Sequence, residues 1–252
     1  MTTLGKHMDR VRWATARARQ LEWLPLVLLM LAAVAIWGFV ELADDVVEGE
    51  VEAFDRTILL SMRTAEDLTD PIGPRWFEEF VRDVTALGST GILVALTVFS
   101  CGYLWLLGKR VAVVYVLVAI LGAQGLSSSL KFAFDRPRPD LVPHGMHVYT
   151  ASFPSGHSVM SAATFLTLGA LLARYQKTRR LRIYLVAVSI LVAIGVGVSR
   201  VYLSVHWPTD VLAGWAIGAA WALICWSAAV YLQRRGTIER QPVEAEAGSS
   251  SS

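Results

Sequence analysis

The chain has 252 residues, of which 54% are hydrophobic and 17% are charged, and its formal net charge is +2. A soluble globular domain carries about 25% charged residues, so the composition indicates an integral membrane protein. It argues against a soluble domain, a disordered chain and a nucleic-acid-binding protein. With two cysteines, Cys101 and Cys225, both inside apolar runs, the chain is not a disulfide scaffold.

Uncharged apolar runs predict six membrane spans. A transmembrane helix takes about 20 apolar residues, and continuous runs of this length indicate helices. The fourth run is short and must begin further back, toward Pro154, and the fifth must continue past Arg200 or Arg182. The sequence therefore predicts an all-α, polytopic membrane protein with six transmembrane helices. The runs occupy residues 23–40, 84–108, 111–130, 158–173, 183–199 and 211–233.

The first run has a second interpretation, as the apolar core of a cleaved signal peptide, because a basic segment precedes it. That segment is long, and no small-x-small cleavage site lies before the acidic stretch that begins at Asp44. We therefore expect a membrane helix behind a basic N-terminal segment, residues 1–23. Residues 24–233 then form the membrane domain, and 234–252 form a polar tail that is predicted to be disordered.

The basic residues predict the orientation of the chain. Of the 23 Lys and Arg residues, 15 lie before the first run, in the second and fourth connections, or after the last run. The positive-inside rule places these segments and both termini in the cytoplasm, with the protein in the cell membrane. The long loop 44–83 and the loops after the third and fifth runs are then external. Residues 54–62 and 76–81 of the long loop fit either interfacial helices or a connector packed over the bundle.

A first polar segment on the external face follows the third run. Lys131 and Arg138 are seven residues apart, a spacing that puts them on one face of a continuous helix. Pro137 and Pro139 end the helix near Asp135, however, so Arg138 returns on a turn. The alternative is a basic cap that snorkels at the membrane boundary, on the face where basic residues should be scarce.

Two further segments begin the fourth and sixth helices. Ser155 is a candidate N-cap, and Gly156 allows a ligand to approach the N–H groups of a helix start that carries His157. His206 lies four residues before Asp210, close enough for the carboxylate to hold one imidazole nitrogen and make the other more basic. The alternatives are an ordinary capped helix start with an interfacial histidine, and a structural His–Asp pair.

Together the three segments gather two histidines, an aspartate and three cations on one face of the membrane. Such residues at a membrane boundary indicate function, and fixed cations with helix N–H groups suit a phosphoryl group. One histidine is a candidate nucleophile and the other a candidate general acid. A metal site on His157, His206 and Asp210 is the alternative, which we disfavour because nearby cations would repel the metal and already neutralise charge.

These residues resemble the three signature motifs of the type 2 phosphatidic acid phosphatase and haloperoxidase superfamily: Lys-x6-Arg-Pro, Pro-Ser-Gly-His and Ser-Arg-x5-His-x3-Asp. All three match in order, at 131–139, 154–157 and 199–210. The six-helix layout is similar to the family's bacterial membrane branch, which includes phosphatidylglycerophosphate phosphatases and undecaprenyl pyrophosphate phosphatases.

The resemblance implies a metal-independent hydrolase without a cofactor, acting on a lipid phosphate of the phosphatidylglycerophosphate, phosphatidic acid or undecaprenyl pyrophosphate type. His206 would form a phosphohistidine, Asp210 would orient His206, and His157 would protonate the leaving group and then assist the attacking water. The groups implied to hold the phosphate are Lys131, Arg138, Arg200, Ser155 and the amide of Gly156.

Other interpretations remain open at this point. The same site would serve a lipid phosphotransferase, which passes the phosphate to another lipid instead of water. A transporter is disfavoured because charged residues flank the apolar runs and do not interrupt their middle. Asp135 and Arg136 lie at variable motif positions and receive no predicted role, and His144 and His147 are expected near the entrance. The sequence makes no prediction of oligomeric state.

Overall fold

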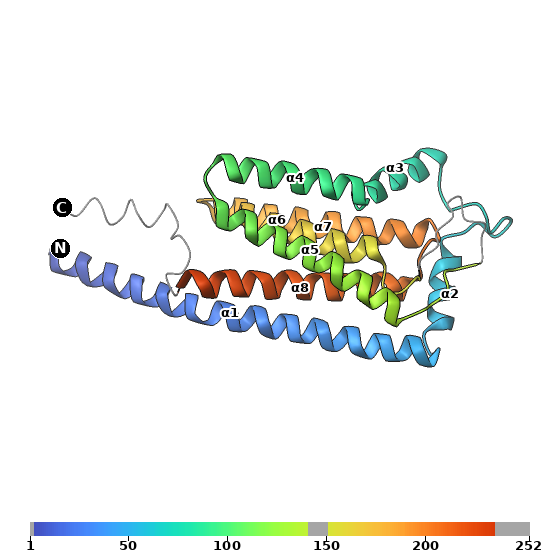
Figure 1. Cartoon of the computed structure of the whole chain (residues 1–252), viewed down its shortest axis with the longest axis horizontal. Coiled ribbons are helices and arrows are strands. Elements are labelled where there is room, and N and C mark those ends of the chain that lie inside the picture. Colours follow the sequence, from blue (N-terminus) through green and yellow to red (C-terminus); the bar gives the residue numbers. More distant parts are fainter. Residues whose placement is uncertain (1–2, 141–150, 235–252) are drawn as a thin grey trace.

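The computed structural model describes the backbone of residues 3–140 and 151–234, and the side chains of residues 23–140 and 151–233. Every named element in these residues is a helix, and the long helices run along one axis (Figure 1), which confirms the all-α prediction. His144, His147 and the predicted tail beyond Arg234 lie outside the described residues. The helices are α1 (Thr3–Glu48), α2 (Glu52–Ser61), α3 (Arg75–Ala86), α4 (Thr90–Leu106), α5 (Arg110–Ala133), α6 (Gly156–Arg174), α7 (Arg179–Tyr202) and α8 (Pro208–Arg234).

Five described helices, α1, α5, α6, α7 and α8, are each long and apolar enough to cross a membrane. The sixth span is the pair α3 and α4, which meets that condition only when joined and is bent by 49°. The expectation of one continuous helix over 84–108 was wrong. The chain breaks after Leu87 and Gly88, where the side chain of Ser89 caps α4 by accepting a hydrogen bond from the Ile92 N–H.

Gly88 allows this break to pack tightly against two neighbouring helices. A Cβ at this position would lie 2.4 Å from Cγ1 of Val196 in α7 and 3.2 Å from Cδ2 of His157 in α6. A distance of 2.4 Å between two carbon atoms is too short for side-chain packing, so a residue larger than glycine does not fit here without movement of Val196. The bend therefore brings the junction of α3 and α4 against the start of α6.

The first helix is longer than predicted, and the long loop is correspondingly shorter. The predicted span 23–40 lies within α1, which extends from Thr3 to Glu48, and α3 begins at Arg75. Between them, α2 lies across the end of the bundle (Figure 1) and packs against α8. For α2 this contact favours the connector interpretation over a helix lying on the membrane surface.

Helix α6 is the centre of the bundle, with contacts to α4, α5, α7 and α8. Of its apolar stretch 56% is buried, compared with 17% for α1. Helix α8 approaches it closely because two glycines face α6. A Cβ at Gly218 would lie 2.5 Å from the Val159 carbonyl oxygen, and one at Gly214 would lie 2.9 Å from that of Ser155. Small residues at such an interface let membrane helices meet backbone to backbone.

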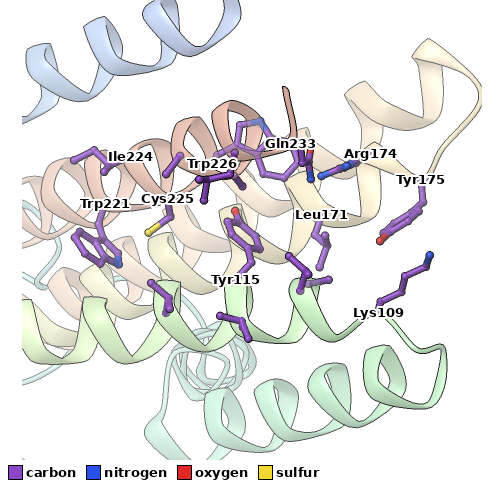
Figure 2. Close-up of a pocket in the computed structure, with 17 residues that line it drawn as sticks. Lys109, Tyr115, Leu171, Arg174, Tyr175, Trp221, Ile224, Cys225, Trp226 and Gln233 are labelled. Carbon is purple, nitrogen blue, oxygen red and sulfur yellow. The ribbon is translucent and has the colours of Figure 1, made fainter. Parts of the chain in front are cut away.

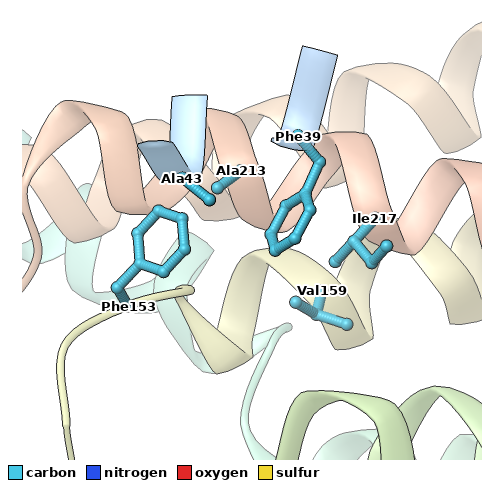
Figure 3. Close-up of a cluster of buried hydrophobic side chains, with 6 residues drawn as sticks. All are labelled: Phe39, Ala43, Phe153, Val159, Ala213 and Ile217. Atoms are coloured by element: carbon cyan, nitrogen blue, oxygen red, sulfur yellow. The ribbon is translucent and has the colours of Figure 1, made fainter. Parts of the chain in front are cut away.

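An aromatic cluster holds the segment that leads into α6. Phe153 is fully buried; its ring stacks on Phe39 of α1 with centroids 5.8 Å apart, and it meets Phe134 edge-on at 5.1 Å. Figure 3 shows Ala43 of α1 and Ala213 and Ile217 of α8 around the rings of Phe39 and Phe153. The packing fixes the backbone on either side of Phe153, which carries Ser152 and Ser155.

Candidate active site

The three predicted polar segments meet at one end of the bundle. Lys131 lies in the last turn of α5 and Arg200 in the last turn of α7, whereas Gly156 and His157 begin α6 and Asp210 lies in the first turn of α8. Because α5 and α7 run antiparallel to α6 and α8, these helix ends coincide, at the right of Figure 1.

His206 is 2% exposed and lies in the short turn between α7 and α8. Its Nδ1 is 3.3 Å from Oδ2 of Asp210, and its Nε2 is 3.2 Å from a guanidinium nitrogen of Arg138. Arginine can only donate, so Nε2 is the acceptor and the proton of the neutral ring is on Nδ1. The structure thus places the predicted His–Asp pair in contact, with the Nε2 lone pair of His206 directed at the Arg138 guanidinium.

The Asp210 carboxylate is fully buried and has donors on both oxygens. Oδ1 accepts from Arg136 at 2.7 Å, and Oδ2 accepts from the Trp207 N–H at 2.9 Å and from the Ser152 hydroxyl. The main-chain carbonyl of Asp210 also accepts a hydrogen bond from the Ser155 N–H at 2.9 Å. A buried charge is tolerated only with such partners, and here the partners also fix the orientation of the carboxylate toward His206.

Burial affects the protonation of the two groups in contact at this turn, His206 and Arg138. It lowers the pKa of His206 to about 4, although the hydrogen bond with Asp210 acts in the opposite direction. Burial also lowers the pKa of Arg138, which nevertheless stays charged because an arginine does not lose its proton in proteins. At neutral pH the site therefore holds a neutral imidazole beside a guanidinium cation.

Lys131, Arg138 and Arg200, the three site cations, lie around the two histidines: all three act electrostatically on His157, and Arg138 and Arg200 act on His206. The Nζ of Lys131 donates to the Ala151 carbonyl at 2.7 Å, and Arg200 donates to the Thr85 hydroxyl at 3.3 Å. The Nε of Arg200 is buried and has no hydrogen-bond partner among the described residues. An unsatisfied buried donor is costly, and an anion bound at this place would satisfy it.

His157 faces the same cluster from the first turn of α6. It is half-buried, and the charges of Arg200 and Lys131 and the ring of His206 all act on it electrostatically. Its Cδ2 lies close to the chain at Gly88, 3.2 Å from the place a Cβ there would take. The two predicted catalytic histidines therefore lie in one cluster, one from the start of α6 and the other from the turn between α7 and α8.

Ser155 is the N-cap of α6, as expected from its position. Its oxygen accepts from the N–H of Ser158 at 3.5 Å and from the Ser158 hydroxyl at 3.0 Å, so only the hydroxyl proton of Ser155 is left to donate to an anion. A Cβ at Gly156 would lie 3.4 Å from Cε of Lys131. The glycine therefore leaves room for the lysine beside the first N–H groups of α6, which have no partner within the helix.

Sequence reasoning missed Arg136 and Asp55. Arg136 contacts Asp210, and it also donates to the Thr209 hydroxyl at 2.8 Å and to Asp55 at 2.7 Å. Asp55 is fully buried and accepts from the N–H and hydroxyl of Thr209 at 2.9 and 2.6 Å. One signal for this network was present, because Asp55 lies on the same face of α2 as the buried Leu59, where a carboxylate requires a partner.

Comparison with known proteins agrees with this geometry. The family model for the PAP2 superfamily matches residues 112–234, which include all three polar segments. Phosphatidylglycerophosphatase B of Bacillus subtilis is 32% identical over 146 residues, which are 57% of this chain and 70% of the relative. Lipid A 1-phosphatase of Rhizobium johnstonii is 34% identical over 119 residues, 44% of this chain and 45% of the relative.

A solved structure shares the fold as well. The crystal structure of a transmembrane PAP2-type phosphatidylglycerolphosphate phosphatase from Bacillus subtilis matches with a TM-score of 0.68 and 25% sequence identity. The match covers 81% of this chain and 98% of that chain. The sequence motifs, the helix arrangement and the meeting of the polar segments at one end of the bundle all agree with this family match. The chain belongs to the PAP2 superfamily and is a membrane-spanning phosphatase of that family.

Proposed function

We propose that this phosphatase removes a terminal phosphate from a membrane lipid through a phosphohistidine intermediate on His206. The observation that carries the proposal is the placement of the His206 ring, with Nδ1 against Asp210 at 3.3 Å and Nε2 beside Arg138 at 3.2 Å. The nitrogen that attacks phosphorus thereby faces the cation that binds the phosphate oxygens. A nucleophile next to an orienting carboxylate and an anion site is the arrangement that covalent catalysis requires.

In the first half-reaction, the Nε2 lone pair of His206 forms a bond to phosphorus as the bond from phosphorus to the lipid oxygen breaks. His157, protonated at this stage, gives its proton to the leaving oxygen. The Nδ1–H donates to Asp210, which stabilises the positive charge that the His206 ring gains. The three site cations neutralise the non-bridging oxygens as charge develops on them.

In the second half-reaction, neutral His157 takes a proton from water, and the water oxygen attacks phosphorus. The bond between phosphorus and Nε2 breaks, and the electron pair returns to His206. The products are inorganic phosphate and the original enzyme, with the His157 proton restored. Because the three site cations already supply positive charge, we expect no metal to take part.

A lipid substrate is supported by the position of the site, at the ends of four membrane-crossing helices. It is also supported by relatives that are named for lipid phosphates. The substrate class is a phosphatidylglycerophosphate, a phosphatidic acid or an undecaprenyl pyrophosphate. From the distribution of basic residues, the site faces the outside of the cell and both termini face the cytoplasm.

The test is phosphate release by the purified protein from each of these lipids in separate detergent assays. We expect phosphate release from at least one lipid, inhibition by vanadate and no inhibition by EDTA. The His206→Ala and His157→Ala proteins should release no phosphate, although their thermal unfolding temperatures equal that of the wild-type protein. Release that depends strictly on an added acceptor lipid would identify a phosphotransferase and contradict the hydrolase proposal. Strong inhibition by EDTA would contradict the metal-free mechanism.

A further inference from the structure

A cavity of about 360 Å³ (Figure 2) opens between α5, α6 and α8. From the order of the helices, its lining residues lie toward the ends of these helices that are opposite His206. Its walls are mainly aromatic and aliphatic, with Tyr115 from α5, Leu171 from α6 and Trp226 from α8. It shares no residue with the catalytic cluster. The proposed phosphatase reaction therefore does not account for this cavity.

The polar side chains of this cavity gather at one end. Figure 2 shows Lys109, Arg174, Tyr175 and Gln233 together there, whereas Trp221 lies at the other end. Lys109 immediately precedes α5, and Arg174 is the last residue of α6. Among its described lining residues there is no Asp or Glu, and Arg174 forms no ion pair within the described part of the chain. The polar end therefore carries two cationic side chains, those of Lys109 and Arg174.

The length of the cavity corresponds to one leaflet of a bilayer. From Trp221 to Gln233 helix α8 rises about 18 Å, and the hydrocarbon core of a bilayer is about 30 Å thick. The cations lie at the ends of membrane-crossing helices, which is the depth of lipid headgroups.

We propose that this cavity binds one anionic phospholipid of the leaflet opposite the catalytic cluster. The phosphodiester group lies at Lys109 and Arg174, and an acyl chain lies along the aromatic wall toward Trp221. A zwitterionic lipid is a poorer occupant because its own ammonium group opposes the two cations. The proposal concerns a second lipid site, and it stands independently of the phosphatase mechanism.

Native mass spectrometry of the purified full chain tests this site, with phosphatidylglycerol and phosphatidylcholine titrated separately. We expect phosphatidylglycerol to bind more tightly and Arg174→Gln to weaken its binding about fivefold or more, as for the loss of one cation near a membrane surface. The matched control is Arg110→Gln, because Arg110 lies beside Lys109 but stacks over Trp105 at 5.3 Å and does not line the cavity. Ala229→Trp, which fills the cavity without changing charge, is expected to abolish binding.

Equal losses for Arg174→Gln and Arg110→Gln would overturn the proposal, since they would indicate general attraction to a basic surface. Equal affinity for phosphatidylcholine would overturn it as well, and so would displacement of the lipid by inorganic phosphate at concentrations near that of the lipid. Phosphate release is measured on the same preparations. We expect the His206→Ala protein to bind phosphatidylglycerol as the wild-type protein does, although it releases no phosphate. Failure of this proposal is therefore distinguishable from failure of the proposed function.

Discussion

Asp55 of α2 and Asp210 of α8 are held by one arginine, because the two terminal nitrogens of Arg136 lie 2.7 Å from one oxygen of each carboxylate. Both carboxylates are fully buried. The arrangement connects a helix outside the membrane-crossing bundle to the residue that orients His206. Helix α2 is thus part of the support of the site and more than a connection between two spans.

Replacing Arg136 tests this support. We expect Arg136→Met to lower kcat about 10-fold to 100-fold, equivalent to roughly 1.4–2.8 kcal/mol, with a smaller change in KM, because two buried carboxylates lose their shared partner and Asp210 shifts away from His206. Arg136→Lys should recover part of the loss. The control is Arg56→Met, whose 47% exposed side chain forms only a surface pair with Glu52. Equal kcat losses for both Met variants would contradict the positioning role.

The bend between α3 and α4 leads to a second prediction. Gly88→Ala should lower kcat about tenfold and reduce the thermal unfolding temperature, because its Cβ would meet Val196 at 2.4 Å and His157 at 3.2 Å. The double variant Gly88→Ala/Val196→Ala should recover much of both. Gly91→Ala is the matched control, since a Cβ there meets nothing within 4 Å. Full activity of the Gly88→Ala protein would show that His157 does not depend on this packing.

The pH profile reports on the His206 ring. The attacking nitrogen must be unprotonated, and burial lowers the pKa of His206 to about 4. The neutral form therefore persists as the pH falls through 6.5, where an exposed histidine would be half protonated, and it is lost only near pH 4. The rate of phosphoenzyme formation, corrected for substrate ionisation and measured with a good leaving group that does not depend on His157, should stay level from pH 7.5 to about 5.5. A tenfold fall across that range would contradict the neutral buried ring.

Orientation is tested by cysteine labelling in intact cells. In a protein with Cys101 and Cys225 replaced by alanine, we expect a membrane-impermeant maleimide to label Asp67→Cys, in the exposed loop between α2 and α3. Lys177→Cys, in the exposed connection between α6 and α7, should react only after the membrane is permeabilised. The opposite pattern would reverse the orientation that the basic residues predict.

Sequence reasoning predicted the features that depend on local spacing. The cap at Ser155, the helix start at Pro208 and the pairing of His206 with Asp210 all involve residues within a few positions of one another. The break at Gly88 was missed because it lies in an uninterrupted apolar run and depends on contact with Val196, over a hundred residues later.

The role of Arg136 was missed for a related reason. Its partner Asp55 is 81 residues away, and the two meet only because α2 folds back over the start of α8. Neither residue belongs to a local pattern that would pair them. A long-range ion pair of this kind follows from the tertiary arrangement, which the order of apolar and polar residues does not specify.

Rapid quenching with a lipid whose terminal phosphate is radiolabelled tests most directly whether His206 carries the phosphoryl group. We expect acid-labile, base-stable label on the peptide that contains His206 in the wild-type protein, and no label in His206→Ala. Label on a different residue would contradict the assignment, and so would phosphate release that persists in His206→Ala.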